Sequence, residues 1–257
     1  MKSLFKAAIL VGSAGFFASC NSSDTSLNSS IGLKMSASTP TGSTVINSGR
    51  VSTSGRAEVN TPITIADVKV NVRDIKFEFD REDHHFKEAH FKKDSCFNDG
   101  DDVRLKGPFL IDLMNAGTFV DQILTSVTVP KGTYRKVRFK LSPSQVDGNM
   151  KGKSIQIDGK IDAATFVFWH NRDAGFGAKF ADSTLQTSTA VANVAIKLEL
   201  DKIFNALNGG IDLTKAVDGN KDGVISIDPT DVDGNKWLAD QIMMLLVRHA
   251  HCEKKDH

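Results

Sequence analysis

The chain has 257 residues, of which 40% are hydrophobic and 25% are charged, which are ordinary proportions for a globular protein. Its formal net charge of +1 becomes −1 for residues 20–257, because Lys2 and Lys6 lie among the first 19 positions. Such a balanced charge lacks the basic footprint of a nucleic-acid-binding protein, so we expect no nucleic-acid partner.

The first 19 residues have the layout of an export signal. A basic start is followed by the apolar run AAILVGSAGFF and by two small residues directly before Cys20. The run is shorter than the about 20 apolar residues that a membrane-spanning helix needs. We therefore predict a signal peptide over residues 1–19.

The tetrapeptide Phe17–Cys20 resembles the bacterial lipobox, in which the cysteine receives a diacylglycerol group, although Phe17 stands where leucine is usual. The resemblance implies a lipidated Cys20, and several acyl chains together hold a protein stably on a membrane. The residue after the cysteine is Asn21 rather than an aspartate. By the enterobacterial sorting rule, this implies the outer membrane of the cell envelope. The alternative is an ordinary secretory signal with a coincidental cysteine.

Residues 20–60 are rich in Ser, Thr, Gly and Asn, a composition typical of flexible linkers. We predict a lipidated cysteine followed by a flexible tether. The alternating stretch from Ile31 to Met35 is the exception, and it predicts a first strand at the edge of a sheet.

A clear alternation of apolar and polar residues, typical of a β-strand, begins at Thr64. Val68, Val70 and Val72 alternate, and from Ile75 onward the apolar residues alternate in the opposite phase. A one-residue change of phase turns side chains to the other face of a sheet. Either a β-bulge near Arg73 or a sharp bend between two strands explains it.

The rest of the domain reads as further short strands with frequent turns, which favours a mainly β fold, an antiparallel β-sandwich with a C-terminal helix. We expect the centre of the domain in Val103–Leu141, a Gly- and Asp-containing loop over Asn171–Ser188, and a structural role for the sole tyrosine, Tyr134. Further strands are expected around Ile155–Ile161, Ala164–His170 and Val194–Leu200.

The order of four segments resembles the DUF4382-type domain of secreted bacterial lipoproteins: VKVNVRDIKFEFD, GPFLIDLMNAG, LTSVTVPKGTYRKVRFKLS and VAIKLELDKIFN. The resemblance covers about residues 64–205, and its most specific piece is Pro130–Arg138. It implies an immunoglobulin- or transthyretin-like sandwich outside the cytoplasm. That family has no established activity, so the resemblance implies no active-site residues.

A candidate calcium loop lies near the C-terminus. Its oxygen donors follow the opening of an EF-hand, with Gly223 at the sixth position of the loop and Pro229 in place of the usual bidentate glutamate. The candidate ligands are Asp218, Asn220, Asp222, Val224 (through its carbonyl), Ser226 and Asp228. The alternative is a turn rich in Asp, Asn and Gly ahead of a strand.

A weaker candidate site for a transition metal combines His84, His85 and His90 with the nearby Cys96, because imidazole suits Zn, Cu or Ni. The alternative is a charged insert between two strands. In an oxidising compartment we expect a disulfide between Cys96 and Cys252, with a reactive thiol as the alternative.

The C-terminal segment Asp233–Arg248 is predicted as an amphipathic helix that contacts the core, with membrane insertion as the alternative and a polar tail after it. Its apolar stripe consists of Trp237, Leu238, Ile242, Leu245 and Leu246. The predicted organisation is a signal peptide (1–19), a tether (20–60), a DUF4382-like sandwich (61–205), and a loop with the helix packed on it (206–257).

These features predict a lipid-anchored envelope protein with a non-catalytic binding domain, stabilised by Ca²⁺ and directed at an envelope protein or glycan. The rival prediction is a periplasmic transition-metal-binding protein that uses the histidine loops. No GxSxG or HExxH motif is present, so we expect no enzymatic activity; a hydrolase whose site has no sequence signature is the third hypothesis.

Overall fold

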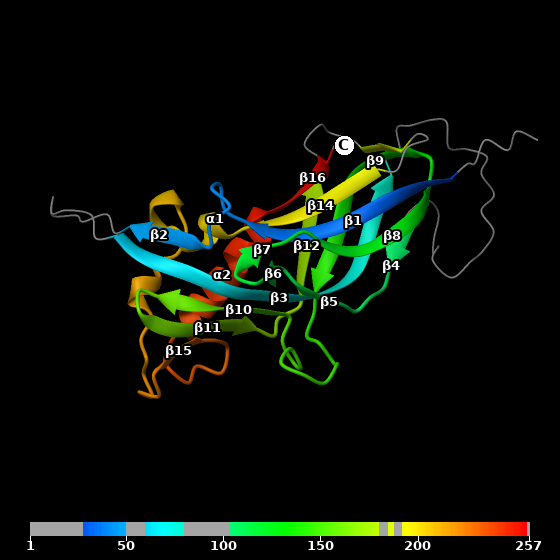
Figure 1. The fold of residues 1–257 in the computed structure, drawn as a ribbon. Coiled ribbons are helices and arrows are strands. Elements are labelled where there is room, and N and C mark those ends of the chain that lie inside the picture. The colour runs from blue at the N-terminus through cyan, green and yellow to red at the C-terminus, as the bar shows by residue number, and fades with distance from the viewer. Residues whose placement is uncertain (1–27, 50–59, 80–102, 180–184, 188–191, 256–257) are drawn as a thin grey trace, which may run out of the picture.

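A computed structural model of the chain describes residues 28–49, 60–79, 103–179, 185–187 and 192–255. The fold is mainly β with a C-terminal helix, as predicted (Figure 1). A four-stranded sheet has the order β16-β14-β1-β8, and a ten-stranded, curled sheet has the order β12-β9-β3-β10-β11-β15, with β2, β4, β5 and β13 attached at its sides. A small hairpin, Met114–Asn115 (β6) and Thr118–Phe119 (β7), completes the β structure of these residues.

The spine of the larger sheet is Asn60–Phe79 (β3), a 20-residue strand with neighbours along both edges. One edge pairs with Val45–Gly49 (β2), Phe109–Asp112 (β5) and Val103–Leu105 (β4), and the other with Ile155–Ile161 (β10) and Gly132–Leu141 (β9). The predicted centre, Val103–Leu141, instead supplies β4 to β9 around this spine.

The phase change within β3 is a bulge, which decides between the two alternatives. Its pairing with β9 shifts register between Arg73 and Lys76, and Asp74 has a φ of 50°. Both Val72 and Ile75 are thereby fully buried, although three positions separate them. The bulge keeps one long strand on the same core.

The larger sheet continues from β9 through Ala174–Lys179 (β12) and Leu185–Thr187 (β13), and from β10 through Ala164–His170 (β11) to Val224–Ile227 (β15). The expectation of a loop over Asn171–Ser188 is therefore wrong for β12 and β13. Phe176 shows why, because its buried ring stacks on Phe139 with centroids 4.8 Å apart.

The smaller sheet is built on Asn28–Ser38 (β1), which lies between Ala192–Glu199 (β14) and Gln122–Pro130 (β8). Ile31, Leu33 and Met35 are fully buried, so the predicted strand is confirmed but is not an edge strand. Since β1 and β2 belong to the two sheets, the prediction of a flexible tether over residues 20–60 is wrong for residues 28–49. The alternating apolar residues of these strands outweigh a locally polar composition.

The chain closes with Leu200–Phe204 (α1), two 3₁₀ turns, Ala206–Asn208 (η2) and Leu213–Lys215 (η3), then β15, Lys236–His249 (α2) and Ala250–Lys255 (β16). Helix α2 contacts α1, β11, β12, β14 and β15. Its buried residues include Leu238, Ile242 and Leu246, which confirms the predicted core contact; Trp237 is 45% exposed instead. The predicted polar tail is a strand, because β16 pairs with β14.

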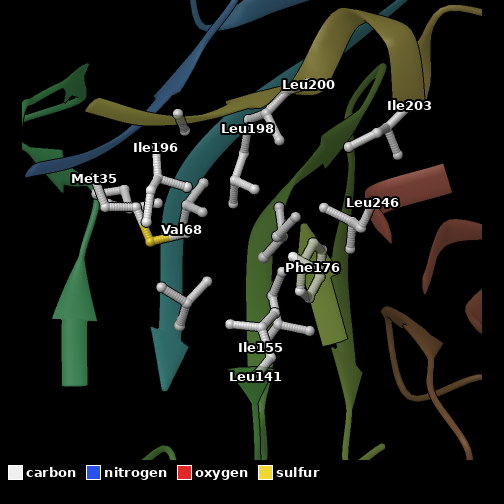
Figure 2. Close-up of a cluster of buried hydrophobic side chains, with 14 of the residues drawn as sticks. Met35, Val68, Leu141, Ile155, Phe176, Ile196, Leu198, Leu200, Ile203 and Leu246 are labelled. Atoms are coloured by element: carbon white, nitrogen blue, oxygen red, sulfur yellow. The ribbon is translucent and has the colours of Figure 1, made fainter. Parts of the chain in front are cut away.

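Side chains from both sheets and from the helices meet in one hydrophobic core. Figure 2 shows Met35 and Ile196 of the smaller sheet beside Val68 of β3, with Ile203 of α1 and Leu246 of α2 extending the same cluster. Tyr134 lies in this core with its ring edge against Phe77, which agrees with the structural role predicted for it. No helix within the described residues is long and apolar enough to cross a membrane.

Candidate functional site

A hollow of about 570 Å³ lies on the outer face of the larger sheet, over β3, β4, β9 and β12. Five of its residues are cationic and two are acidic, so it concentrates a net charge of +3 in a chain whose total is +1. We call it the basic groove. Its residues are Asp74, Lys76, Glu78, Arg104, Lys136, Arg138, Phe139, Lys140, Gly175, Phe176 and Gly177.

The strand register aligns positive charges across the basic groove. Lys76 of β3 stands directly opposite Arg104 of β4 on one side and Arg138 of β9 on the other. Arg73 likewise stands opposite Lys140. Like charges directly opposite one another destabilise a sheet. Arg138 pairs with Glu78 and Lys140 lies 3.8 Å from Asp173, so part of this charge is offset within the protein.

Glu78 anchors one of these cations. Its side chain is only 11% exposed, and Oε1 lies 2.5 Å from Nε of Arg138 in an ion pair. A buried carboxylate needs such a partner, because an unpaired charge at low exposure is costly. The pair fixes the guanidinium of Arg138, which carries four further N–H donors, at the wall of the groove.

Glycines form the edge of the basic groove. Gly175 faces Lys140 across the strand pair, and a Cβ at this position would meet nothing within 4 Å. At Gly177, a Cβ would come within 2.5 Å of Cε of Lys136, so the lysine side chain lies across this glycine. The stacked rings of Phe139 and Phe176 are 1% and 3% exposed. The groove is thus hollow because β12 lacks side chains there.

A second polar cluster surrounds Lys69 further along β3. Lys69 is paired with Asp67 and lies 3.7 Å from Asp112. Burial lowers the pKa of Lys69, but the hydrogen bond to Asp67 and the nearby carboxylates outweigh it, so the pKa is raised overall. Asp158 stands opposite Asp67, and burial first, then the charge of Asp67, raises its pKa against the lowering effect of Gln156. The acidic groups mostly compensate the charge of Lys69, so this cluster is less suited to a charged ligand than the basic groove.

The candidate calcium loop is curled so that three predicted ligands converge. Asp218 accepts hydrogen bonds from the backbone N–H of Asp222 at 3.2 Å and of Gly223 at 2.9 Å. Asn220 Nδ2 donates to Asp222 Oδ2 at 3.0 Å. Positive φ angles at Lys221 (62°) and Gly223 (90°) produce the tight winding. Oxygen donors on such a loop suit a hard cation.

Two buried residues that the sequence did not single out brace this loop. Asp233 is 3% exposed and accepts from the N–H of Asn220 at 3.0 Å and of Ser226 at 2.7 Å. Asn235 is 1% exposed, accepts from the N–H of Val217 and donates to the carbonyls of Val217 and Ser226. They lie beyond the 12 positions of the EF-hand pattern, so the motif could not reveal them.

The other predicted ligands of this loop are arranged differently. Asp228 Oδ1 accepts from both the backbone N–H and the hydroxyl of Thr230, so it faces the following turn. Val224 donates its N–H to Asp222 and begins β15, and Ser226 is held through its backbone by Asp233 and Asn235. Within the described residues no three His, Cys, Asp or Glu side chains form a group that could hold a metal. A cation here would depend on Asp218 and Asp222, the amide oxygen of Asn220 and a carbonyl.

The remaining predicted site residues lie outside the part of the chain that the structure describes. These are Cys20, His84, His85, His90 and Cys96. Cys252 lies in β16 opposite Ile196, so its strand is placed, while the disulfide with Cys96 stays a prediction. The transition-metal hypothesis and the lipidation of Cys20 stay predictions for the same reason.

A buried histidine, His170, was not expected to take part in any site. Its Nδ1 accepts from the N–H of Arg172 at 2.9 Å, and its Nε2 lies 3.4 Å from Asp240 of α2. Ser154 donates its hydroxyl to the carbonyl of His170 rather than to the imidazole. This arrangement ties β11 to α2 and does not have the serine–imidazole hydrogen bond of a catalytic triad.

Comparisons with known proteins add little to this picture. No family model matches the chain, and no curated protein matches it. Among solved structures, the chain is similar to MbnP from Methylosinus trichosporium, with 10% identity, covering 72% of this chain and 79% of that one, at a TM-score of 0.33. At this TM-score the likeness carries no argument about function.

Part of the basic groove could be predicted from the sequence. The alternation that marks Val137, Phe139 and Leu141 as core residues places Lys136, Arg138 and Lys140 on the opposite face of β9. A single basic strand face is common, however. The alignment with Lys76 and Arg104 depends on strand register, which the sequence alone does not state.

Proposed function

We propose that this chain is a lipid-anchored protein of the bacterial cell envelope whose β-sandwich binds an anionic ligand in the basic groove without acting on it chemically. The observation that carries the proposal is the alignment of Arg104, Lys76 and Arg138 in one row across three strands. The groove residues together keep a net charge of +3 even with the ion pair of Glu78 and Arg138 counted, which favours an anionic ligand. The rigid strands hold the cations in place before any ligand arrives.

The location in the envelope rests on the sequence. The signal-like residues 1–19 and the lipobox-like end at Cys20 support export and lipidation. The DUF4382-like order of segments agrees with a sandwich outside the cytoplasm. Calcium in the Asp218 loop would act as a structural ion, because Asp218, Asn220 and Asp222 already converge. The transition-metal hypothesis keeps only its sequence support.

A pair of substitutions at Gly175 tests the groove. The position has open space and no positive φ, so both Gly175→Asp and Gly175→Asn can be accommodated. The two side chains have nearly the same shape, and only aspartate adds a negative charge beside Lys140. Their difference therefore isolates the electrostatic contribution.

We expect inositol hexakisphosphate, used as a compact polyanion at low ionic strength, to raise the melting temperature of the native protein and of Gly175→Asn. A ligand that binds only the folded state must stabilise it. In Gly175→Asp the increase should fall to less than half. The proposal is wrong if the native protein shows no increase, or if all three proteins respond equally.

A further inference from the structure

We infer that the ligand of the basic groove is an extended acidic glycan chain that bears sulfate, carboxylate or phosphate groups. This inference rests on the proposed function and adds the class of ligand. The spacing of the cations, the burial of the groove aromatics and the recessed shape of the site point to this class of ligand.

The cations form a grid rather than a single focus. Neighbouring strands lie about 4.8 Å apart, so the row from Arg104 through Lys76 to Arg138 spans about 10 Å across the sheet. Lys136 and Lys140 lie two residues to either side of Arg138, which places them about 13 Å apart along β9. One phosphate or sulfate ion can reach only one or two of these positions. Several anionic groups at intervals of about 5–10 Å would engage the whole grid.

Glu78 acts as a positioning residue in this grid. Its carboxylate pairs with Nε of Arg138, which orients the planar guanidinium. The two terminal nitrogens of Arg138 are left for bidentate contact with an oxyanion. Lys136 is the residue opposite Glu78 on β9, so this buried acid lies between two cations. The arrangement stiffens one side of the groove.

A nucleic acid fits this surface poorly. Proteins that bind single strands combine a basic groove with exposed aromatic rings on which bases stack. The aromatic groove residues Phe139 and Phe176 are buried at 1% and 3% exposure and stack on each other. The total charge of +1 also gives no broader electrostatic attraction to a duplex.

A flat membrane surface fits it poorly as well. The cations lie in a hollow that is open at Gly175, whereas contact with a bilayer needs side chains that protrude. Sugars bear many hydroxyl groups and follow a narrow, extended path, which suits a polar hollow of about 570 Å³. We therefore favour a glycan over a lipid headgroup.

Calorimetric titration of the full mature chain at low ionic strength tests the inference with defined probes. A sulfated heparin hexasaccharide and a carboxylated hexagalacturonate represent acidic glycans, and maltohexaose is the uncharged control. Inositol hexakisphosphate represents a compact polyanion, a 12-residue oligothymidylate represents nucleic acid, and sedimentation with vesicles of anionic phospholipid tests membrane binding. We expect at least one acidic hexasaccharide to bind more tightly than all the other probes.

The matched variants remove two positive charges each. Arg104→Gln/Lys140→Gln acts within the groove, and Lys160→Gln/Lys236→Gln acts at exposed positions outside it. We expect the groove variant to weaken hexasaccharide binding about tenfold or more, as loss of charge-assisted hydrogen bonds implies, and the control variant less than about twofold.

The outcomes separate the two proposals. If inositol hexakisphosphate, oligothymidylate or vesicles bind more tightly than both acidic glycans, the glycan assignment is overturned while an anion-binding groove stands. Equal binding of maltohexaose overturns the assignment of an acidic glycan, and equal effects of the two double variants overturn the groove as the binding site and with it the proposed function. If no anionic probe binds, the proposed function fails together with the glycan assignment.

Discussion

At the scale of single residues, the pair of Glu78 and Arg138 shows how the fold keeps a charge inside the groove wall. Glu78 is 11% exposed at its side chain and Arg138 is 57% exposed. The pair is therefore intermediate between a surface ion pair, which contributes little, and a fully buried pair, whose disruption is strongly destabilising.

Arg138→Gln should lower the free energy of unfolding by about 1–2 kcal/mol, because it removes the ion-pair partner of the Glu78 carboxylate, although Lys136 still stands opposite it. The double variant Glu78→Gln/Arg138→Gln should recover most of this loss. Urea unfolding monitored by tryptophan fluorescence measures both. A single variant as stable as the native protein would show that the pair does not hold the wall.

Asp158 predicts a pH dependence with a defined sign. Burial and the facing Asp67 raise its pKa above the ordinary value of 3.8, so the folded state disfavours its ionised form. Its stabilising contribution is present below pH 3.8 and is lost as the pH rises through the raised pKa. Asp158→Asn should therefore raise the melting temperature at pH 7 and leave it nearly unchanged near pH 3. A lower melting temperature at pH 7 would contradict this assignment.

At the scale of elements, the sequence predicts strands well where one face is buried and polar residues alternate with core residues. β3, β9, β10, β11 and β14 follow from this pattern, and so does α2 from its helical spacing. The prediction of strands fails where the amino-acid composition hides this alternation. β12 carries glycines at positions 175 and 177 and only two buried side chains, Ala174 and Phe176, among the residues the structure places there.

The Asp218 loop was predicted from local spacing, and the structure brings Asp218, Asn220 and Asp222 together. Its support from Asp233 and Asn235 could not be predicted, because both act through backbone groups on the far side of the loop. The loop is thus held in a wound shape by the protein itself. A cation would add to that order.

Millimolar Ca²⁺ should raise the melting temperature of the native protein, with a stabilisation of about 1.4 kcal/mol when Ca²⁺ is at ten times its dissociation constant. Asp222→Asn should reduce this increase. Asp231→Asn removes the same charge near the loop and should keep the increase in melting temperature. Asp231 is not a predicted ligand, because its carboxylate accepts a hydrogen bond from the N–H of Lys236 instead. An unchanged melting curve with Ca²⁺ in the native protein would remove the site.

At the scale of the whole molecule, the mainly β sandwich could be predicted, but the assignment of its strands to the two sheets could not. β1 pairs in parallel with β14, about 160 residues later in the chain, and β16 joins the far side of β14. Such pairings depend on contacts distant in sequence, for which local alternation carries no information. The basic groove has the same origin, since β4, β3, β9 and β12 come from four separate segments.

Anchoring of the whole molecule is tested at Cys20. Expressed in a Gram-negative host with labelled palmitate, the native chain should incorporate the label and sediment with membranes. Cys20→Ser should do neither, since it offers no thiol for the diacylglycerol group. Equal labelling of the two proteins would contradict the lipid anchor.

The most direct measurement of the central claim is a map of lysine protection when the acidic hexasaccharide binds. Acetylation followed by mass spectrometry should show Lys76, Lys136 and Lys140 protected, because all three line the basic groove. Lys160 and Lys236 lie outside it and should react equally with and without the ligand. Protection of Lys160 and Lys236 with no change at the groove lysines would contradict the account.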